Sequence, residues 1–448
     1  MEEKKQIILK TASGTFKGNQ NADSCEFLGI PYARAERFRY AELIDSYEET
    51  DCTDYGSSCP QYRMYFPQLN NPERLFYHKE FREGITFHYD EDCLNLNIFT
   101  PLNPHNCPVA LFLHGGGFNS GSNEEEPFRG YELAKRGIIT VFANYRVGVF
   151  RYLTHEGIQK EYGRDGNFGL DDQRTALLWV RKHIREFGGD PDNITLFGQS
   201  AGAIAIQYLL LDHRNEGLFR RVFMMSGAGL FPKFALPRTA EKTREYWLEL
   251  METAGVKSLE ELRTLDVKTL LTAAQTMKEK RSDTLYNTMP VIDGLMIEKP
   301  VDQLIRNPID VPCMIGFTNN DMYAPLMAKI GCDYAKRHNG WVYYFDKDAP
   351  GDANAAFHSA DLRYVFGRLH TSWRPYDSRD EEISQELLDY FASFAKTGNP
   401  GTKGRPGWQN CQDGFVNVLR ITAEKTAMGS VDYKKLLKNM IQKGNPKA

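Results

Sequence analysis

The G-x-S-x-G pentapeptide at 198–202, Gly-Gln-Ser-Ala-Gly, constrains the fold of this chain more than any other stretch. The apolar run at 194–197 is typical of a buried strand, and the apolar run at 201–211 is typical of a helix. The serine between them therefore lies at a sharp turn, where a crowded backbone leaves no room for side chains at the flanking glycines. Such a turn raises the hydroxyl of Ser200 above the sheet and predicts a nucleophilic serine.

The five residues alone also fit a glycine-rich turn before a helix, so other parts of the chain must supply the remaining groups. A glycine-rich loop at 114–118, His-Gly-Gly-Gly-Phe, follows a fully apolar, strand-like run at 109–113. Three consecutive glycines expose backbone N–H groups that no side chain shields. We expect two of these groups, together with the N–H of Ala201, to bind the oxyanion of a tetrahedral intermediate.

The catalytic base is expected well after the serine, because the chain order that accompanies this turn is serine, acid, histidine. The histidines that follow the serine are His213, His338, His358 and His370. His213 is too close in sequence to fold back onto the turn, and His338 lies in a charged, surface-like stretch. His358 is favoured because it follows the strand-like run at 342–345, and open α/β sheets place their sites beyond the carboxyl ends of strands. His370 is the second choice.

Asp321 is the favoured acid, because it follows the strand-like run at 311–315. A carboxylate there would accept the Nδ1–H of His358 and stabilise the imidazolium that forms when the serine gives up its proton. Three other carboxylates between the serine and His358 compete for this role: Asp293, Glu298 and Asp302. They stay open as alternatives, although the residues around Asp293 favour a turn.

Short apolar runs alternate with helical patterns through the middle of the chain, which predicts an α/β fold. We expect a central, mostly parallel sheet that is flanked by helices on both faces. Helices are predicted over 170–187 and 382–397, and Gly398 closes the second. The simplest architecture is a single domain over 1–448, with a helical insertion at about 232–285 that contributes to the substrate pocket.

The charge balance argues against several classes of partner. The chain has 448 residues with 55 Lys and Arg against 59 Asp and Glu, a net charge of −4, which does not predict binding to nucleic acid or to an acidic membrane. No run approaches the length of a membrane span and the start lacks a signal-like apolar core, so a cytoplasmic protein is expected.

No Cys/His cluster has zinc spacing, and no metal or organic cofactor is expected.

The motifs above, with several others, give the chain a resemblance to the type-B carboxylesterases, which include cholinesterases and many bacterial esterases. The stretches that carry the resemblance are Phe27–Ala33, Glu91–Asn97, His114–Phe118, Asn144–Gly148, Gly166–Gln173, Phe187–Gly202 and Ala356–His358. The resemblance implies an α/β-hydrolase fold and a serine esterase of bacterial-esterase type that works through an acyl-enzyme. It implies Ser200 as the nucleophile, His358 as the base and Asp321 as the acid.

The resemblance also assigns supporting roles. It implies Gly116, Gly117 and Ala201 as the oxyanion donors, and Ser226 as a serine that helps to hold the triad. Gln199 stands where the cholinesterases have Glu, so a negative charge beside the nucleophile is absent.

Two further departures narrow the expectation. Asp321 stands where the family usually has Glu, so the acid is one methylene shorter and His358 must approach it more closely. The stretch 60–92 holds no Trp that could seat a quaternary ammonium, so neutral carboxylic esters are expected rather than choline esters.

The sequence leaves several alternatives open. The same triad can cleave amides, carbamates or thioesters, because the shape of the pocket sets the preference for a leaving group. A non-catalytic interaction protein on the same fold is a further alternative, although such proteins typically lack a triad member. We expect a small-molecule ester as the substrate and a monomer or a homodimer. Cys59 and Cys93 resemble a pair that forms a disulfide in secreted members, and either redox state is open here.

Overall fold

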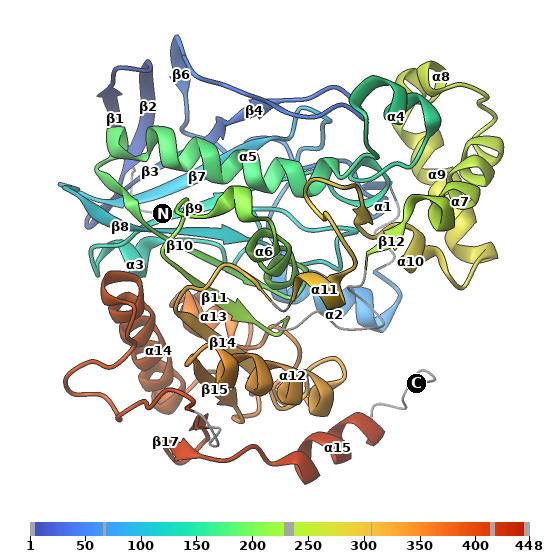
Figure 1. The fold of residues 1–448 in the computed structure, drawn as a ribbon. Coiled ribbons are helices and arrows are strands. Elements are labelled where there is room, and N and C mark those ends of the chain that lie inside the picture. The colour runs from blue at the N-terminus through green and yellow to red at the C-terminus, as the bar shows by residue number, and fades with distance from the viewer. Residues whose placement is uncertain (1–4, 66–68, 228–236, 306, 413–416, 443–448) are drawn as a thin grey trace.

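The computed structural model describes residues 5–65, 69–227, 237–305, 307–412 and 417–442. One large sheet forms its centre (Figure 1). In spatial order its strands are β1 (Lys5–Lys10), β2 (Thr15–Gln20), β3 (Ser24–Pro31), β7 (Asn95–Pro101), β9 (Ile139–Ala143), β8 (Cys107–Leu113), β10 (Gly189–Gln199), β11 (Arg221–Met225), β14 (Cys313–Thr318), β15 (Trp341–Phe345), β16 (Val418–Ile421) and β17 (Thr426–Gly429). The short β6 (Glu49–Asp51) pairs with β2.

The middle of this sheet is parallel, from β9 through β8, β10, β11, β14 and β15 to β16. Along the main order, the strand pairs at both ends of the sheet are antiparallel, whereas β6 pairs with β2 in parallel. Two small ribbons lie apart from it, β4 (Ala33–Arg34) with β5 (Glu42–Leu43), and β12 (Arg238–Thr239) with β13 (Val291–Ile292). Because parallel strands end at the same edge, the loops that follow β8, β10, β14 and β15 meet there.

Helices cover both faces of the parallel strands (Figure 1). One face carries α5 (Phe168–His183), α6 (Ala201–Leu211) and α12 (Ala324–Arg337), and the other carries α3 (Tyr131–Ala134), α13 (Leu362–Val365) and α14 (Ser378–Thr397). Along β8, Leu111 and Leu113 pack into the first core, whereas Ala110 and Phe112 pack into the second. The strand is apolar on both sides because helices bury both. The predicted α/β class is confirmed.

The remaining helices connect or extend these layers. They are α1 (Tyr62–Tyr65), α2 (Pro72–Phe81), α4 (Glu156–Tyr162), α7 (Ala240–Thr253), α8 (Leu259–Thr264), α9 (Val267–Lys280), α10 (Thr284–Asn287), α11 (Val301–Leu304) and α15 (Tyr433–Gln442), with 3-10 helices η1 (Gly148–Phe150), η2 (Ile184–Phe187), η3 (His213–Asn215) and η4 (Leu369–Thr371). Across the described ranges, no helix combines the length and apolar character that a bilayer span requires.

The helices α7 to α10 gather at one end of the molecule, to the right in Figure 1. They follow β11 and precede β14, in the region where the sequence predicts a helical insertion at about 232–285. Residues 232–236 of that range lie outside the described residues. The single-domain organisation and the contribution of the insertion to a pocket stay predictions.

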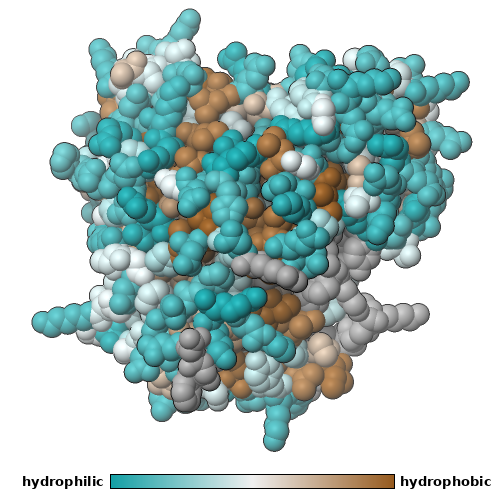
Figure 2. Space-filling view, viewed as in Figure 1, coloured by the Kyte–Doolittle hydropathy of each residue, from teal (hydrophilic) through white to brown (hydrophobic). Residues whose placement is uncertain are grey.

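The surface of the same view is mostly hydrophilic, with scattered hydrophobic areas (Figure 2). Some of this hydrophobic surface lies low in the view, where Figure 1 places α12 and α15. Exposed apolar side chains of these two helices include Leu326, Leu437 and Ile441.

The boundaries of α14 show how local sequence sets a helix. The helix begins at Ser378, four residues before the predicted start, because Asp377 caps it. The carboxylate of Asp377 accepts the N–H groups of Arg379 and Asp380, and the carboxylate of Asp380 accepts the N–H of Asp377 in return. Gly398 ends the helix with a φ of 82°, as its position predicts.

Two other predicted boundaries shift. The helix predicted over 170–187 is α-helical only to His183, and η2 forms its last turn. The strand predicted over 311–315 is β14, which begins at Cys313 because Pro312 has no N–H to join the ladder.

The approach of α6 to β8 leaves no space for a side chain at Gly202. A Cβ on Gly202 would lie 1.9 Å from the backbone carbonyl oxygen of Leu113, and one on Gly198 would lie 2.9 Å from the same oxygen. Both distances are shorter than non-bonded contacts allow. The pentapeptide therefore needs glycine at these positions because strand and helix cross in contact there.

We predict that Gly202→Ala lowers the free energy of unfolding by about 2 kcal/mol or more, because backbone atoms must move to admit the methyl group. Gly407→Ala is the control, since a Cβ at Gly407 meets no atom within 4 Å. Urea denaturation of both variants measures the difference. Equal midpoints for the two variants would contradict the prediction.

Candidate active site

Ser200 occupies a strained turn between β10 and α6. Its φ of 55° and ψ of −122° lie in a region that residues with a Cβ rarely adopt. The N–H of Ser200 donates to the carbonyl of Met225 at 2.8 Å, and the carbonyl of Ser200 accepts the N–H of Ile204 at 3.0 Å. These two hydrogen bonds hold the serine at the carboxyl edge of the sheet, at the N-terminus of α6.

The glycine-rich loop after β8 lies directly against this serine. A Cβ on Gly115 would be 3.1 Å from the Cβ of Ser200. Gly116 and Gly117 have φ values of 111° and 61°, which glycine adopts without strain. Within the described parts of the chain, no acceptor meets the N–H groups of Gly116, Gly117 or Ala201. Unpaired donors beside a serine can bind a developing negative charge.

Arg63 holds the glycine loop from outside, a contact that sequence reasoning missed. The carbonyl of Gly116 accepts the N–H of Ser120 at 3.2 Å and its hydroxyl at 3.3 Å. Arg63 donates to the same hydroxyl of Ser120 and lies 3.6 Å from Glu125. Arg63 precedes Ser120 by 57 residues without a recognisable motif, so no local signal pointed to this contact.

His114, at the start of the loop, is buried and stacks on Tyr145 with ring centroids 4.3 Å apart. Its Nδ1 lies 2.9 Å from the carbonyl of Gly115. Burial lowers the pKa of His114 to about 4, so the ring is neutral at pH 7. These contacts give His114 a structural role.

His358 and Asp321 meet at the same edge of the sheet. Asp321 follows β14, His358 follows β15, and Nδ1 of His358 is hydrogen-bonded to Oδ1 of Asp321. The second carboxylate oxygen of Asp321 accepts the N–H of Thr318 at 3.2 Å, which fixes the carboxylate. The Asp321 side chain is fully buried, whereas the His358 side chain is 21% exposed. A buried acid thus orients a ring that solvent can reach.

The other ring nitrogen of His358, Nε2, lies 3.2 Å from the side-chain amide nitrogen of Gln199. With Nδ1–H directed to Asp321, Nε2 carries a lone pair and accepts an N–H of Gln199. Of the contacts that the structure describes, none is a hydrogen bond between His358 and Oγ of Ser200. Hydrogen bonds of this kind are often long in sites without substrate and tighten when it binds.

The other candidates from the sequence lie elsewhere. His213 pairs with Glu216 at 3.7 Å, His338 faces Asp310 at 3.3 Å, and His370 is exposed on η4. Oδ1 of Asp293 accepts the N–H groups of residues 295–297, which is the turn that its sequence predicts. Glu298 and Asp302 are exposed side chains.

The model of the carboxylesterase family matches residues 5–333 and 323–440. The chain belongs to the carboxylesterase family. The resemblance stated above is confirmed, and the protein is a carboxylic ester hydrolase with the α/β-hydrolase fold.

The chain is similar to known esterases and lipases over most of its length. The para-nitrobenzyl esterase of Bacillus subtilis (strain 168) is 29% identical, over 98% of this chain and 99% of its own. The bile salt-activated lipase of Mus musculus is 36% identical, over 85% of this chain and 76% of its own. The solved structure of a thermophilic PNB esterase superposes with a TM-score of 0.80 at 26% identity, over 96% of this chain and 100% of the other.

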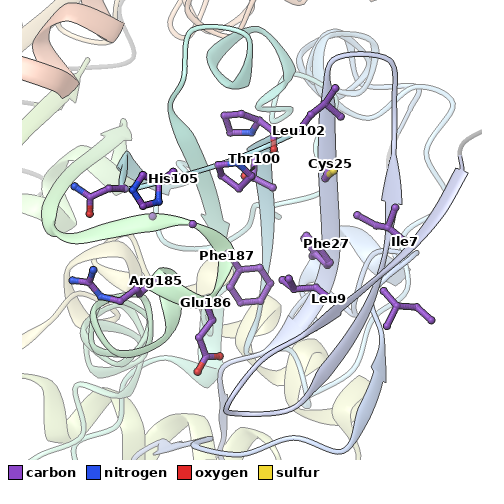
Figure 3. A pocket seen from close by; sticks show the side chains of 16 residues that line it. Ile7, Leu9, Cys25, Phe27, Thr100, Leu102, His105, Arg185, Glu186 and Phe187 are labelled. Carbon is purple, nitrogen blue, oxygen red and sulfur yellow. Dashed lines mark hydrogen bonds between the residues drawn. The ribbon is translucent and has the colours of Figure 1, made fainter.

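This carboxylesterase has a groove of about 580 Å³ at the edge of the sheet opposite to the candidate site (Figure 3). Leu9, Phe27 and Phe187 line it, beside the amino-terminal ends of β8 and β10. Ser200 follows the carboxyl end of β10, so the groove is separate from the candidate site.

Two further buried groups lie near the triad candidates. Ser226 follows β11 with a φ of 51°, and no hydrogen-bond partner of its hydroxyl is among the described residues. Asp361 is fully buried three residues after His358, and sequence reasoning did not identify it. Its Oδ2 accepts the hydroxyl proton of Tyr343 at 2.5 Å. Burial raises the pKa of Asp361 to about 6, and the nearby carboxylate of Asp321 adds to this effect.

We predict that Asp361→Asn changes the pH dependence of stability. A folded-state pKa of about 6, above the ordinary value of 3.8, means that the contribution of Asp361 to wild-type stability falls as the pH rises from about 4 to 6. The variant lacks this loss. Its free energy of unfolding relative to wild type should therefore be more favourable by about 2 kcal/mol at pH 7.5 than at pH 4.5. Urea denaturation at the two pH values tests this, and a difference independent of pH would count against it.

Proposed function

We propose that this chain hydrolyses neutral carboxylic esters by a Ser200–His358–Asp321 triad through an acyl-enzyme. The observation that carries the proposal is the meeting of four loops, those after β8, β10, β14 and β15, at one edge of the sheet. There a strained serine, unpaired backbone donors and a histidine hydrogen-bonded to a buried carboxylate lie together.

The proposed reaction has two steps. Oγ of Ser200 forms a bond to the ester carbonyl carbon while its proton moves to Nε2 of His358. The resulting oxyanion is bound by the N–H groups of Gly116, Gly117 and Ala201. The alcohol leaves with the proton from Nε2. Water then attacks the acyl-serine, its proton moves to Nε2, and the carboxylic acid leaves as Ser200 regains a proton.

Asp321 has two tasks in this scheme. It keeps the proton of the neutral His358 ring on Nδ1, so the lone pair is on Nε2, and it stabilises the imidazolium that forms. The hydroxyl of Ser200 replaces Gln199 at Nε2 when substrate binds. Because Gln199 is neutral, no fixed negative charge faces the acyl group, which favours uncharged esters. Ser226 supports the triad from the end of β11.

Several observations bear on the substrate class. A relative over almost the whole chain is named a para-nitrobenzyl esterase, which supports a small-molecule ester with a neutral alcohol. Amides, carbamates and thioesters are the second candidates, because they pass through the same tetrahedral geometry. The presence of all three triad residues argues against a non-catalytic interaction protein. A cytoplasmic location, a monomer or homodimer, and the lack of nucleic-acid partners stay predictions.

We predict that Ser200→Ala folds normally but loses at least about 1,000-fold in kcat on p-nitrophenyl esters, because no nucleophile remains. A fluorophosphonate probe should label the wild type and leave this variant unlabelled. Ser393→Ala, on α14 at the other face of the sheet, is the control and should keep both properties. Normal turnover by purified Ser200→Ala would refute the proposed nucleophile.

We predict that Asp321→Asn lowers kcat by about 100- to 10,000-fold, since an amide stabilises the wrong tautomer of His358. Asp293→Asn is the matched control, because this carboxylate only caps a turn. Its kcat should stay within about three-fold of wild type. Steady-state kinetics on a p-nitrophenyl ester compares them, and the reverse order of losses would assign the acid to Asp293.

A further inference from the structure

The loops that carry the proposed acid and base are joined to each other by a short stretch of strand-like pairing. Asn320 forms an isolated parallel bridge with Phe357, and its N–H donates to the carbonyl of Ala356 at 3.0 Å. Asp321 is the next residue on one side, and His358 is the next residue after Phe357 on the other. The hydrogen bond between the acid and the base therefore depends on how this pairing is held.

Asn319 closes the pairing with its side chain. Its Oδ1 accepts the N–H of Ala356 at 3.1 Å, and its backbone N–H donates to the carbonyl of Phe345 at 2.9 Å. Its Nδ2 donates to Asp346 at 3.2 Å and to Asp348 at 2.6 Å. Asn319 is fully buried, and both ends of its amide are used. One side chain thus ties the end of β14 to the end of β15 and to the loop of the base.

The helix α15 braces the same point from outside. The side-chain amide of Asn439 donates to the backbone carbonyl of Asn319 at 3.0 Å. Lys435, one turn earlier, pairs with Asp346 at 2.7 Å, and Leu436 between them is fully buried. Figure 1 shows α15, near the C-terminus, below α12 and outside the central sheet. Its contacts to Asn319 and Asp346 therefore bring the last described helix to the acid loop.

We propose that Asn319 is a positioning residue that keeps Asp321 and His358 at hydrogen-bonding distance, with Asn439 of α15 as its outer support. This inference rests on the proposed triad. Asn319 touches neither the substrate nor the reacting atoms. It acts through Ala356, two residues before His358, and through its own chain, two residues before Asp321. A displacement of about 1 Å at a catalytic group can cost roughly 100-fold in rate, so a tie at this point has kinetic consequences.

The test compares Asn319→Ala with a matched control. Asn215 is equally buried, on η3, and its amide donates to the carbonyl of Leu209 at 3.0 Å, away from the triad loops. We expect Asn319→Ala to lower kcat by about 10- to 100-fold with KM within about three-fold of wild type. Asn215→Ala should lose thermal stability to a similar extent but keep kcat. Asn439→Ala should lower kcat by less than Asn319→Ala, in the same direction.

The pH profile separates positioning from a general loss of stability. The acidic limb of kcat/KM reports protonation of the base in the free enzyme, and we expect Asn319→Ala to move it by about half a pH unit or more. Asn215→Ala should leave the limb in place.

Exchanging the amide of Asn319 and the carboxylate of Asp348 tests whether the side-chain amide of Asn319 positions the two loops. Asn319→Asp keeps the acceptor for Ala356 but sets a third carboxylate against Asp346 and Asp348, so kcat should fall. The double variant Asn319→Asp/Asp348→Asn has the same total charge as the wild type and again has an amide donor between positions 319 and 348. Its kcat should be at least about five-fold higher than that of Asn319→Asp alone.

The outcomes of these tests are distinct from those of the proposed function. If Ser200→Ala keeps turnover and fluorophosphonate labelling, the triad itself is wrong. If Ser200→Ala is inactive but Asn319→Ala loses no more kcat than Asn215→Ala, with an unmoved acidic limb, the positioning role is overturned. Failure of Asp348→Asn to restore any of the activity lost in Asn319→Asp also overturns it.

Discussion

The contact between Gly202 and the end of β8 is the constraint on which the candidate site depends. The helix α6 begins so close to the carbonyl of Leu113 that a single methyl group cannot be placed there. The loop at 114–118 begins directly after Leu113, the last residue of β8. Ser200 directly precedes α6, two residues before Gly202. This packing contact therefore sets how closely the serine and the unpaired N–H groups can lie, because α6 already meets the end of β8 with no space between them.

The strain at the end of the strands is offset by an extension of the sheet ladder. Ser200 and Ser226 have positive φ values, yet each donates its N–H to the next strand, to Met225 and to Gly316 respectively. Asn319 does the same toward Phe345. The first residues of three successive loops thus stay tied to neighbouring strands. Side chains above a rigid sheet edge keep their geometry better than side chains on free loops, which suits a reaction that needs groups aligned within a fraction of an ångström.

The parts of the site that local sequence controls could be predicted, and the parts that distant contacts control could not. The turn at Ser200 and the glycine loop follow from runs of adjacent residues, so their strands, helix and glycines were predicted directly. His358 and Asp321 could be reached only by combining chain order, their places after strand-like runs and the resemblance, because several histidines and carboxylates were candidates. The contacts of Arg63 with Ser120 and of Gln199 with His358 join residues 57 and 159 positions apart, and a single sequence carries no signal for them.

The short side chain of Asp321 gives the pairing of the two loops a physical reason. Asp321 has a short side chain, so its carboxylate meets Nδ1 of His358 only where the two loops lie close together. The bridge between Asn320 and Phe357 brings them to the spacing of paired strands, about 5 Å. A strand-like contact of one residue pair is weak in isolation. The buried amide of Asn319 adds a second tie at the same place, so backbone and side chain together hold the two loops close enough for Asp321 to reach His358.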